Sequence, residues 1–334
     1  MMKIGVIGAG SWGTTLADLL ATKGYPVTLW AYEPDLVERM QESYQNDLYL
    51  AEHDLSYNLS FTNNLQQAVT GKSMVLFVPP SQVLRTVLQQ ALPYFDDEAI
   101  IVSASKGIEN DTLLPMSEIF AELLPPALKG RTAYLSGPSF AREVAARMPT
   151  AVAVAAVDAA VADTVQQLFS TDYFRVYTNS DAVGVELGGA LKNVIALAAG
   201  VSDGLGYGYN TRAALITRGL AEITRIGIAM GAEPLTFSGL AGMGDLVLTC
   251  TGDLSRNRTV GFELGQGKTL KQILDGMHMV AEGVKTTLSA YQLCQKLGVE
   301  APLIDQMYEI LYNNKDPRQA VSDLMERDLK PEGV

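Results

Sequence analysis

The chain has 334 residues, enough for two domains that each bury a hydrophobic core. Its hydrophobic residues (48%) and charged residues (19%) occur in the proportions of an ordinary soluble globular protein. The formal net charge of −12 argues against non-specific binding to nucleic acid or anionic membranes, so an anionic substrate needs a local group of basic residues.

The first half of the chain alternates between strand patterns and helical patterns. Apolar and β-branched runs predict strands at residues 3–7, 27–30, 74–78, 99–103, 133–136, 151–157 and 174–177. Helical patterns lie between several of them, for example at 14–22 and 83–92. The alternation predicts βαβ units and a largely parallel, doubly wound α/β sheet in a first domain, residues 1–178.

A glycine-rich turn follows the first predicted strand. The stretch KIGVIGAGSWG places Gly8, Gly10 and Gly13 between this strand and a helix. Gly8 permits a tight turn, Gly10 lets phosphate groups approach, and Gly13 allows close packing of helix on strand. This context predicts a pyrophosphate at the helix N-terminus, so residues 1–178 are interpreted as a dinucleotide-binding domain. A purely structural glycine turn is the alternative.

The end of the second predicted strand bears on the choice between NAD and NADP. Ala31 stands directly after the strand, where an acidic residue is usual, and Glu33 follows two positions later. Glu33 is able to reach a ribose 2′-hydroxyl and would repel a 2′-phosphate, and no arginine precedes Arg39. The sequence therefore favours NAD. A plainly solvent-exposed Glu33 is the alternative.

After about residue 179 the pattern changes to long segments with a period of 3.6 residues, and no strand is predicted. Helices are expected at 303–311 and 319–324. One buried helix face is indicated by residues three or four positions apart, at Val284, Leu288, Tyr291 and Cys294. We therefore predict an all-helical substrate and catalytic domain over residues 179–334.

An apolar helix in this half carries a lysine at its centre. In LGGALKNVIALAAG, residues 187–200, Lys192 and Asn193 interrupt an otherwise apolar run. Most residues that share a helix face with Lys192 are small, including Gly188, Gly189 and Ala196. Lys192 either snorkels from a partly exposed helix or lines a cleft that a ligand enters.

Three other segments carry polar groups at positions suited to ligand binding. SASKGI places Lys106 just beyond the carboxyl end of a strand, where open α/β sheets bind ligands. LSGPSFAREV places Gly137 and Ser139 at the start of a helix, although Ser139 as a helix cap alone is an alternative. In LAGMGDLVLTCTGDLSRNRTVG, Asp245 lies in a glycine-rich turn ahead of a basic group.

That basic group consists of Arg256, Asn257 and Arg258. Arginine binds phosphate oxygens bidentately, so in this acidic chain the group predicts a phosphate clamp, with a solvated surface run as the alternative. A substrate with a phosphate at one end and a redox-active carbon at the other is then expected. Lys192 would transfer the proton that accompanies hydride transfer, at a pKa lowered by burial and by Lys106, with Asp245 orienting it.

The cysteines and histidines predict neither a disulfide framework nor a metal site. Cys250 and Cys294 lie in unrelated contexts, and His53 and His278 are scattered. No run of about 18 uninterrupted apolar residues occurs, and no signal peptide precedes the first strand. A cytoplasmic protein without metal is expected, and a homodimer is one hypothesis for its assembly.

The motifs together resemble bacterial, soluble NAD(P)-dependent glycerol-3-phosphate dehydrogenases over nearly the whole chain. The resemblance rests on GAGSWG, SASKGI, LSGPSFA, ELGGALKNVIALAAG, GMGDLVLTCTGDLSRNR and VAEGV. It implies a Rossmann-type domain followed by a helical one. It also implies reversible reduction of dihydroxyacetone phosphate to sn-glycerol 3-phosphate with NADH or NADPH, which would supply phospholipid synthesis.

The resemblance also implies residue roles, with Lys192 as the proton acceptor during oxidation. Implied substrate contacts are Lys106, Gly137, Ser139, Lys192, Asp245, Ser255, Arg256 and Asn257. Cofactor contacts, together with the glycines of the loop, would be Ser11, Trp12, Lys106, Ala141, Arg256, Val280 and Glu282. Tyr32 and Glu33 stand where family members often carry His or Arg, so we expect NADH to be at least competitive with NADPH.

Two other functions fit parts of the sequence. Another two-domain dehydrogenase, acting on a hydroxy acid or on ketopantoate, would need a cation for a carboxylate, and Arg256 would supply one. A redox-sensing regulator that binds NAD without turnover would need the glycine loop alone. The joint presence of Lys192, Asp245 and Arg256 speaks against the regulator.

Overall fold

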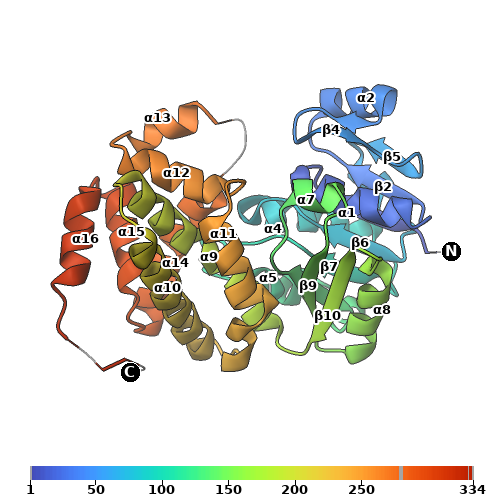
Figure 1. The fold of residues 1–334 in the computed structure, drawn as a ribbon. Helices are drawn as coiled ribbons and strands as arrows, with labels where there is room; N and C mark the ends of the chain where they lie inside the picture. Colours follow the sequence, from blue (N-terminus) through green and yellow to red (C-terminus); the bar gives the residue numbers. More distant parts are fainter. Residues whose placement is uncertain (1, 278–280, 330, 333–334) are drawn as a thin grey trace.

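The computed structural model describes residues 2–277, 281–329 and 331–332. Its N-terminal half is built on one sheet, and its C-terminal half is a helical body packed beside it (Figure 1). The sheet has the strand order β10-β9-β8-β7-β6-β1-β2-β5. Its strands are β1 Ile4–Ile7, β2 Val27–Trp30, β5 Leu59–Thr62, β6 Met74–Phe77, β7 Ile100–Ser103, β8 Thr132–Ser136, β9 Thr150–Ala155 and β10 Phe174–Asn179.

All neighbouring strands in this sheet are parallel except β8 and β9, which pair antiparallel. Strand β1 lies between β2 and β6, so the order of the chain reverses at β1. In open parallel sheets a crevice forms at the carboxyl ends of the strands at such a switch point. The glycine loop that follows β1 therefore stands at the position where this architecture binds its ligand.

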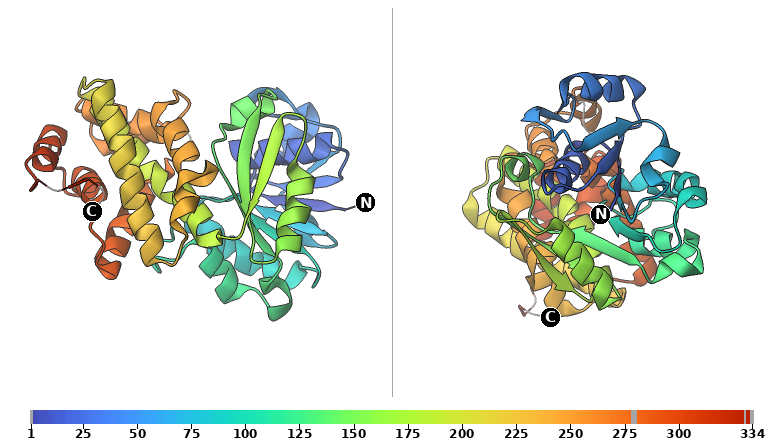
Figure 2. Two further views of the ribbon diagram at one scale, coloured as in Figure 1. Left: turned by 60° about the horizontal axis from the view of Figure 1, so that its bottom comes forward. Right: turned by 90° about the vertical axis from the view of Figure 1, so that its right-hand side faces the viewer.

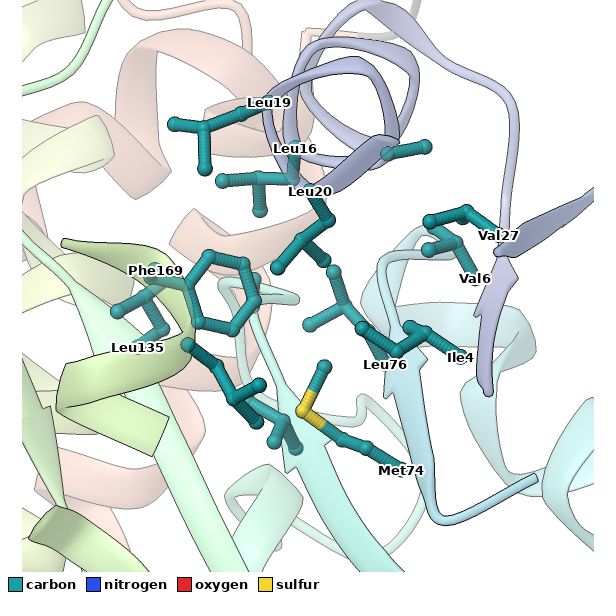
Figure 3. Close-up of a cluster of buried hydrophobic side chains, with 14 of the residues drawn as sticks. Ile4, Val6, Leu16, Leu19, Leu20, Val27, Met74, Leu76, Leu135 and Phe169 are labelled. Carbon is teal, nitrogen blue, oxygen red and sulfur yellow. The ribbon is translucent and has the colours of Figure 1, made fainter. Parts of the chain in front are cut away.

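Helices cover both faces of the sheet. Alternate residues of β6 belong to different cores: Met74 and Leu76 pack with α1, whereas Val75 and Phe77 pack with α4 and α5. Figure 3 shows the first of these cores, where α1 side chains meet those of β1, β6 and Phe169. The helices of this half are α1 Ser11–Thr22, α2 Pro34–Ser43, α3 Leu65–Val69, α4 Ser81–Ala91, α5 Met116–Leu123, α6 Pro126–Lys129, α7 Ala141–Ala145 and α8 Ala159–Phe169.

The helical half is organised around α9, Ala182–Gly204, which is buried over most of its length. By length and composition α9 could cross a membrane, but 83% of its most apolar window lies inside the fold, as in a core helix. Further helices of this half are visible in both views of Figure 2. They are α10 Tyr209–Ala229, a π-helix at Leu240–Gly244, α11 Asp245–Thr251, α12 Arg256–Gly265, α13 Leu270–Asp275, α14 Glu282–Leu297, α15 Pro302–Tyr312 and α16 Pro317–Met325.

Glycines let α9 and α12 pack backbone against backbone. A Cβ atom added at Gly261 of α12 would lie 2.0 Å from the carbonyl oxygen of Leu197, and one added at Gly200 of α9 would lie 2.1 Å from that of Arg258. Side chains at these positions would force the helices apart. The close approach fixes the N-terminus of α12 relative to the centre of α9.

The predicted fold class is confirmed, and each predicted strand lies within two residues of an observed one. The sequence did not predict β5, nor the hairpin of β3 (Gln45–Asn46) and β4 (Leu50–Asp54), nor the antiparallel pairing of β8 with β9. Strand β3 has two residues, and β4 reads LAEHD with exposed polar residues, so neither shows the apolar pattern of a buried strand. In the described part of the second half, no strand follows β10, as expected.

Candidate active site

Two lysines from different halves of the chain meet one carboxylate. Lys106 follows β7, Lys192 lies at the centre of α9, and Asp245 begins α11 directly after the π-helix. The ammonium group of Lys106 lies 2.6 Å from Oδ2 of Asp245, and that of Lys192 donates to Oδ1 of the same carboxylate. Lys192 also donates to the hydroxyl of Thr249 at 2.8 Å.

Burial and charge set the protonation of Lys192. The residue is only 7% exposed, so it does not snorkel to solvent, and Asp245 is 1% exposed. Burial lowers the pKa of Lys192 to about 8; the carboxylate of Asp245 opposes this change, and the positive charge of Lys106 adds to it. A lysine with a pKa near neutrality can both give and accept a proton under physiological conditions.

The predicted segments around Lys106 converge on this cluster. The Lys106 ammonium group donates to the carbonyl of Gly137 at 3.3 Å, and the hydroxyl of Ser139 donates to the same oxygen at 3.1 Å. Ser139 is not the cap of α7: Phe140 occupies the N-cap position, without a side-chain hydrogen bond. The capping explanation of Ser139 is therefore wrong, and its side chain faces the segment that contacts Lys106.

The basic group divides into two parts with different surroundings. Arg256 is the exposed first residue of α12 and makes no hydrogen bond or ion pair within the described part of the chain. The guanidinium of Arg258 instead lies 2.9 Å from Asp203 and 3.0 Å from Asp253. The charge of Arg258 is therefore already paired, mainly with the buried Asp203, which sets it apart from Arg256.

Asn257 and Ser255 tie the start of α12 to α9 and α14. The side-chain amide of Asn257 donates to Oδ1 of Asn193 at 2.9 Å and accepts from the backbone of Gly283 at 3.0 Å. Ser255 caps α12, with its hydroxyl accepting from the backbone of Arg258 at 3.3 Å. Arg256 is thus presented from a fixed helix end, beside the residue that follows Lys192 in sequence.

The glycine loop forms a cradle that fits a dinucleotide. Gly8 has φ +114°, a conformation that favours glycine, and a Cβ at Gly13 would lie 1.9 Å from the carbonyl oxygen of Gly8. A Cβ at Gly10 would meet nothing within 4 Å, so open space lies in front of the N-terminus of α1. The indole N–H of Trp12 is buried without a partner in the described part of the chain. The dipole of α1 suits a pyrophosphate here.

The predicted cofactor residues outside the loop have different environments. Tyr32 is 80% exposed after β2, whereas Glu33 is partly buried at the start of α2 and accepts from the Tyr49 hydroxyl at 2.9 Å. Ala141 opens α7, and its carbonyl accepts from Thr15 at 3.3 Å. Glu282 opens α14; burial raises its pKa to about 7, against the positive charges of nearby Arg256, Lys106 and Lys192. Val280 lies outside the described residues.

Sequence reasoning missed three residues that contact this machinery, namely Thr249, Asn46 and Tyr49. Thr249 stands four positions after Asp245, so a helical reading of the stretch DLVLT would have placed both on one face. Asn46 and Tyr49 carry no local signal of these roles, because their contacts with Ala9, Thr14 and Glu33 join distant parts of the chain.

The described residues hold no group of three or more His, Cys, Asp or Glu side chains able to bind a metal. Cys250 and Cys294 are free thiols, and burial raises the pKa of each to about 12. Neither is a reactive thiolate.

Comparison with known proteins finds similarity to one family over both halves of the chain. Residues 3–162 match the family described as NAD-dependent glycerol-3-phosphate dehydrogenase N-terminus, and residues 181–322 match the corresponding C-terminus. A glycerol-3-phosphate dehydrogenase [NAD(P)+] of Syntrophotalea carbinolica is 68% identical over 331 residues, 99% of each chain. The crystal structure of glycerol-3-phosphate dehydrogenase from Coxiella burnetii superposes with a TM-score of 0.93 at 40% identity, covering 98% of this chain and 99% of the other.

A ketopantoate reductase from Ralstonia eutropha superposes with a TM-score of 0.60 at 16% identity, covering 96% of this chain and all of the other. That likeness shows a shared fold alone. The predictions of an oxidoreductase and of an NAD(P) cofactor are confirmed by the closer relatives. The chain belongs to the NAD-dependent glycerol-3-phosphate dehydrogenase family.

Proposed function

We propose that this chain reversibly reduces dihydroxyacetone phosphate to sn-glycerol 3-phosphate with Lys192 as the proton-transfer residue. The observation that carries the proposal is the buried contact of Lys192 and Lys106 with the single carboxylate of Asp245. The names of the relatives supply the substrate. The bound nicotinamide supplies or accepts the hydride.

The proposed roles follow from the contacts. Lys192 gives its proton to the carbonyl oxygen of the substrate during reduction and takes it back during oxidation, while Asp245 and Thr249 hold its ammonium group. Lys106 adds positive charge beside the developing alkoxide and draws the substrate toward the cluster. Gly137 lines the same side of the site through its contact with Lys106, and Ser139 joins it by donating to the Gly137 carbonyl.

Arg256 and Asn257 would bind the phosphate, from a helix start that Ser255 caps. Arg256 supports this role because it is a cation that makes no hydrogen bond or ion pair among the described residues, in a chain with net charge −12. Its guanidinium matches phosphate oxygens bidentately. Glu282 and Ala141 would face the cofactor together with the glycine loop, and Glu33 would accept from the ribose 2′-hydroxyl of NADH.

The division into a dinucleotide-binding domain, residues 1–178, and a helical substrate domain, residues 179–334, belongs to this proposal. It is supported by the end of β10 at Asn179 and the start of α9 at Ala182. The proposal includes a cytoplasmic location and a supply of sn-glycerol 3-phosphate for phospholipid synthesis. Two free cysteines suit a reducing compartment.

The test is an absorbance assay of NADH and NADPH loss with dihydroxyacetone phosphate, and with unphosphorylated dihydroxyacetone as a control. We expect turnover with the phosphorylated ketone alone. Arg256→Met should raise the KM for dihydroxyacetone phosphate at least tenfold, because a charge-assisted hydrogen bond contributes ~1.5–3 kcal/mol. The matched variant Arg258→Met removes the same charge from a side chain already paired with Asp203 and should leave that KM within about twofold.

Equal effects of the two arginine variants would contradict the phosphate assignment. Turnover of 2-keto acids in place of dihydroxyacetone phosphate would contradict the substrate itself. Lys192→Met should lose turnover while it still binds NADH; a variant that keeps kcat near the wild-type value would contradict the role of Lys192.

A further inference from the structure

The short β3–β4 hairpin reaches back to the cofactor side of the first domain. It is formed by residues between α2 and β5, a stretch in which the sequence predicted no element. Its residue Asn46 is completely buried although its side chain is polar. A buried amide is costly unless its donors and acceptor are satisfied, so the partners of Asn46 show what the hairpin holds.

Those partners belong to the glycine loop and to α1. The Asn46 amide nitrogen donates to the carbonyl oxygen of Ala9 at 2.8 Å and to the hydroxyl of Thr14 at 2.8 Å. The Thr14 hydroxyl itself donates to the carbonyl of Ala9 at 3.1 Å. Both N–H groups of Asn46 thus help to fix the carbonyl of Ala9, which belongs to the peptide group between Ala9 and Gly10.

The remaining polar atom of Asn46 connects this peptide to Glu33. Oδ1 of Asn46 accepts from the backbone N–H of Tyr49 at 3.0 Å, and the Tyr49 hydroxyl donates to Oε1 of Glu33 at 2.9 Å. One continuous chain of hydrogen bonds therefore runs from the glycine loop through Asn46 and Tyr49 to the carboxylate after β2. The far end of the hairpin is docked on α1, where His53 lies 2.9 Å from Asp18.

We propose that the β3–β4 hairpin is the cofactor-positioning element of this enzyme. Asn46 holds the Ala9 peptide so that the backbone around Gly10 keeps the shape that a pyrophosphate requires. Tyr49 holds one oxygen of Glu33 and directs the other toward the ribose, which favours a 2′-hydroxyl over a 2′-phosphate. Both are positioning residues, and the second step rests on the proposed role of Glu33 in selecting NADH.

The two residues should differ in what they change. Asn46 acts on the pyrophosphate, which NADH and NADPH share, so Asn46→Ala should raise the KM for both cofactors about tenfold (~1.4 kcal/mol) with kcat within twofold. Tyr49 acts on the ribose, so Tyr49→Phe should lower the ratio of kcat/KM for NADH to that for NADPH at least threefold. The KM for dihydroxyacetone phosphate should stay constant in both variants.

Gln45 provides the matched control. It precedes Asn46 in the same strand, and its amide donates to Asp54 within the hairpin at 2.7 Å, away from the loop. Gln45→Ala should change neither the cofactor KM values nor their ratio. Thermal unfolding is measured for every variant, because a purely structural role of Asn46 would lower Tm without any change in KM. If Asn46→Ala does not fold, the nearly isosteric Thr14→Val carries the same test, since it removes one partner of the network.

The outcomes separate this inference from the proposal on which it rests. Cofactor KM values and ratios near those of the wild type in Asn46→Ala (or Thr14→Val) and Tyr49→Phe would overturn the role of the hairpin. If Glu33→Gln changes the ratio of kcat/KM for NADH to that for NADPH and Tyr49→Phe does not, the Tyr49 step is overturned while Glu33 keeps its function. An unchanged ratio in Glu33→Gln would instead remove Glu33 from cofactor selection, and the Asn46 result would still decide the first step.

Discussion

Replacing Asp245 with asparagine tests how the site sets the protonation of Lys192. The substitution keeps the size and an acceptor oxygen but removes the negative charge shared by Lys106 and Lys192. At about 4 Å and an effective dielectric constant of about 20, one such charge pair is worth ~4 kcal/mol. Since the amide still accepts a hydrogen bond, we expect only part of this, at least one pKa unit, or ~1.4 kcal/mol.

The direction of the change follows from the causes of the present pKa. Burial and Lys106 lower the pKa of Lys192, and Asp245 is the group that opposes them, holding it at about 8. Without the carboxylate the pKa must fall further. During reduction Lys192 has to carry a proton, so activity is lost as the pH rises through its pKa. In Asp245→Asn this loss should begin at least one pH unit lower.

The assay is kcat/KM for dihydroxyacetone phosphate over about pH 6 to 10, because this ratio reports the pKa values of the free enzyme. The control is Asp253→Asn, which removes the same charge from a side chain that is 96% exposed and pairs with Arg258. Its pH profile should match the wild type, since an exposed pair is screened by solvent. A folded Asp245→Asn enzyme whose profile coincides with the wild type would refute the assignment of Lys192 as the titrating group.

Two further substitutions address packing and buried charge. Gly261→Ala should lower the free energy of unfolding by ~1–3 kcal/mol and raise the KM for dihydroxyacetone phosphate. The reason is that the new Cβ would lie 2.0 Å from the carbonyl oxygen of Leu197 and displace α12. Chemical denaturation and kinetics equal to those of the wild type would contradict the close packing. Burial raises the pKa of Glu186 to about 8, whereas the pKa of an unfolded glutamate is near its ordinary value of 4.5, so wild-type stability should fall as the pH rises between these values. The Tm of Glu186→Gln relative to wild type should therefore increase from pH 5 to pH 8, and a constant difference would show that Glu186 is already ionised in the folded state.

Local patterns sufficed for the parts of the fold that repeat along the chain. The strands that are buried on both faces appear in the sequence as short apolar runs. The glycine-rich stretch predicted the turn between β1 and α1. The sequence also named Lys106, Lys192 and Asp245 as candidates, and the structure brings them to one point. Their types and their positions at element ends were visible before any contact was known.

Contacts between distant residues account for what the sequence could not predict. Arg258 was grouped with Arg256 because they are two positions apart, but Asp203, which lies 55 positions away, pairs with Arg258 and leaves Arg256 exposed. Asn46 acquires its function from Ala9, which is 37 positions away. In each case the partner is chosen by tertiary packing, and periodicity within one segment carries no information about it.

The same packing supports the proton transfer that we propose for Lys192. An isolated lysine at this depth would lose its charge, and an exposed lysine would hold its proton too tightly near neutral pH. Burial is the main cause of the lowered pKa of Lys192; Asp245, from the helical half, opposes it, and Lys106, from the sheet half, adds to the lowering. The pKa of about 8 thus depends on both halves being packed together. Substitutions that loosen the contact between β8 and α9 should consequently shift the pH profile even where they touch no substrate.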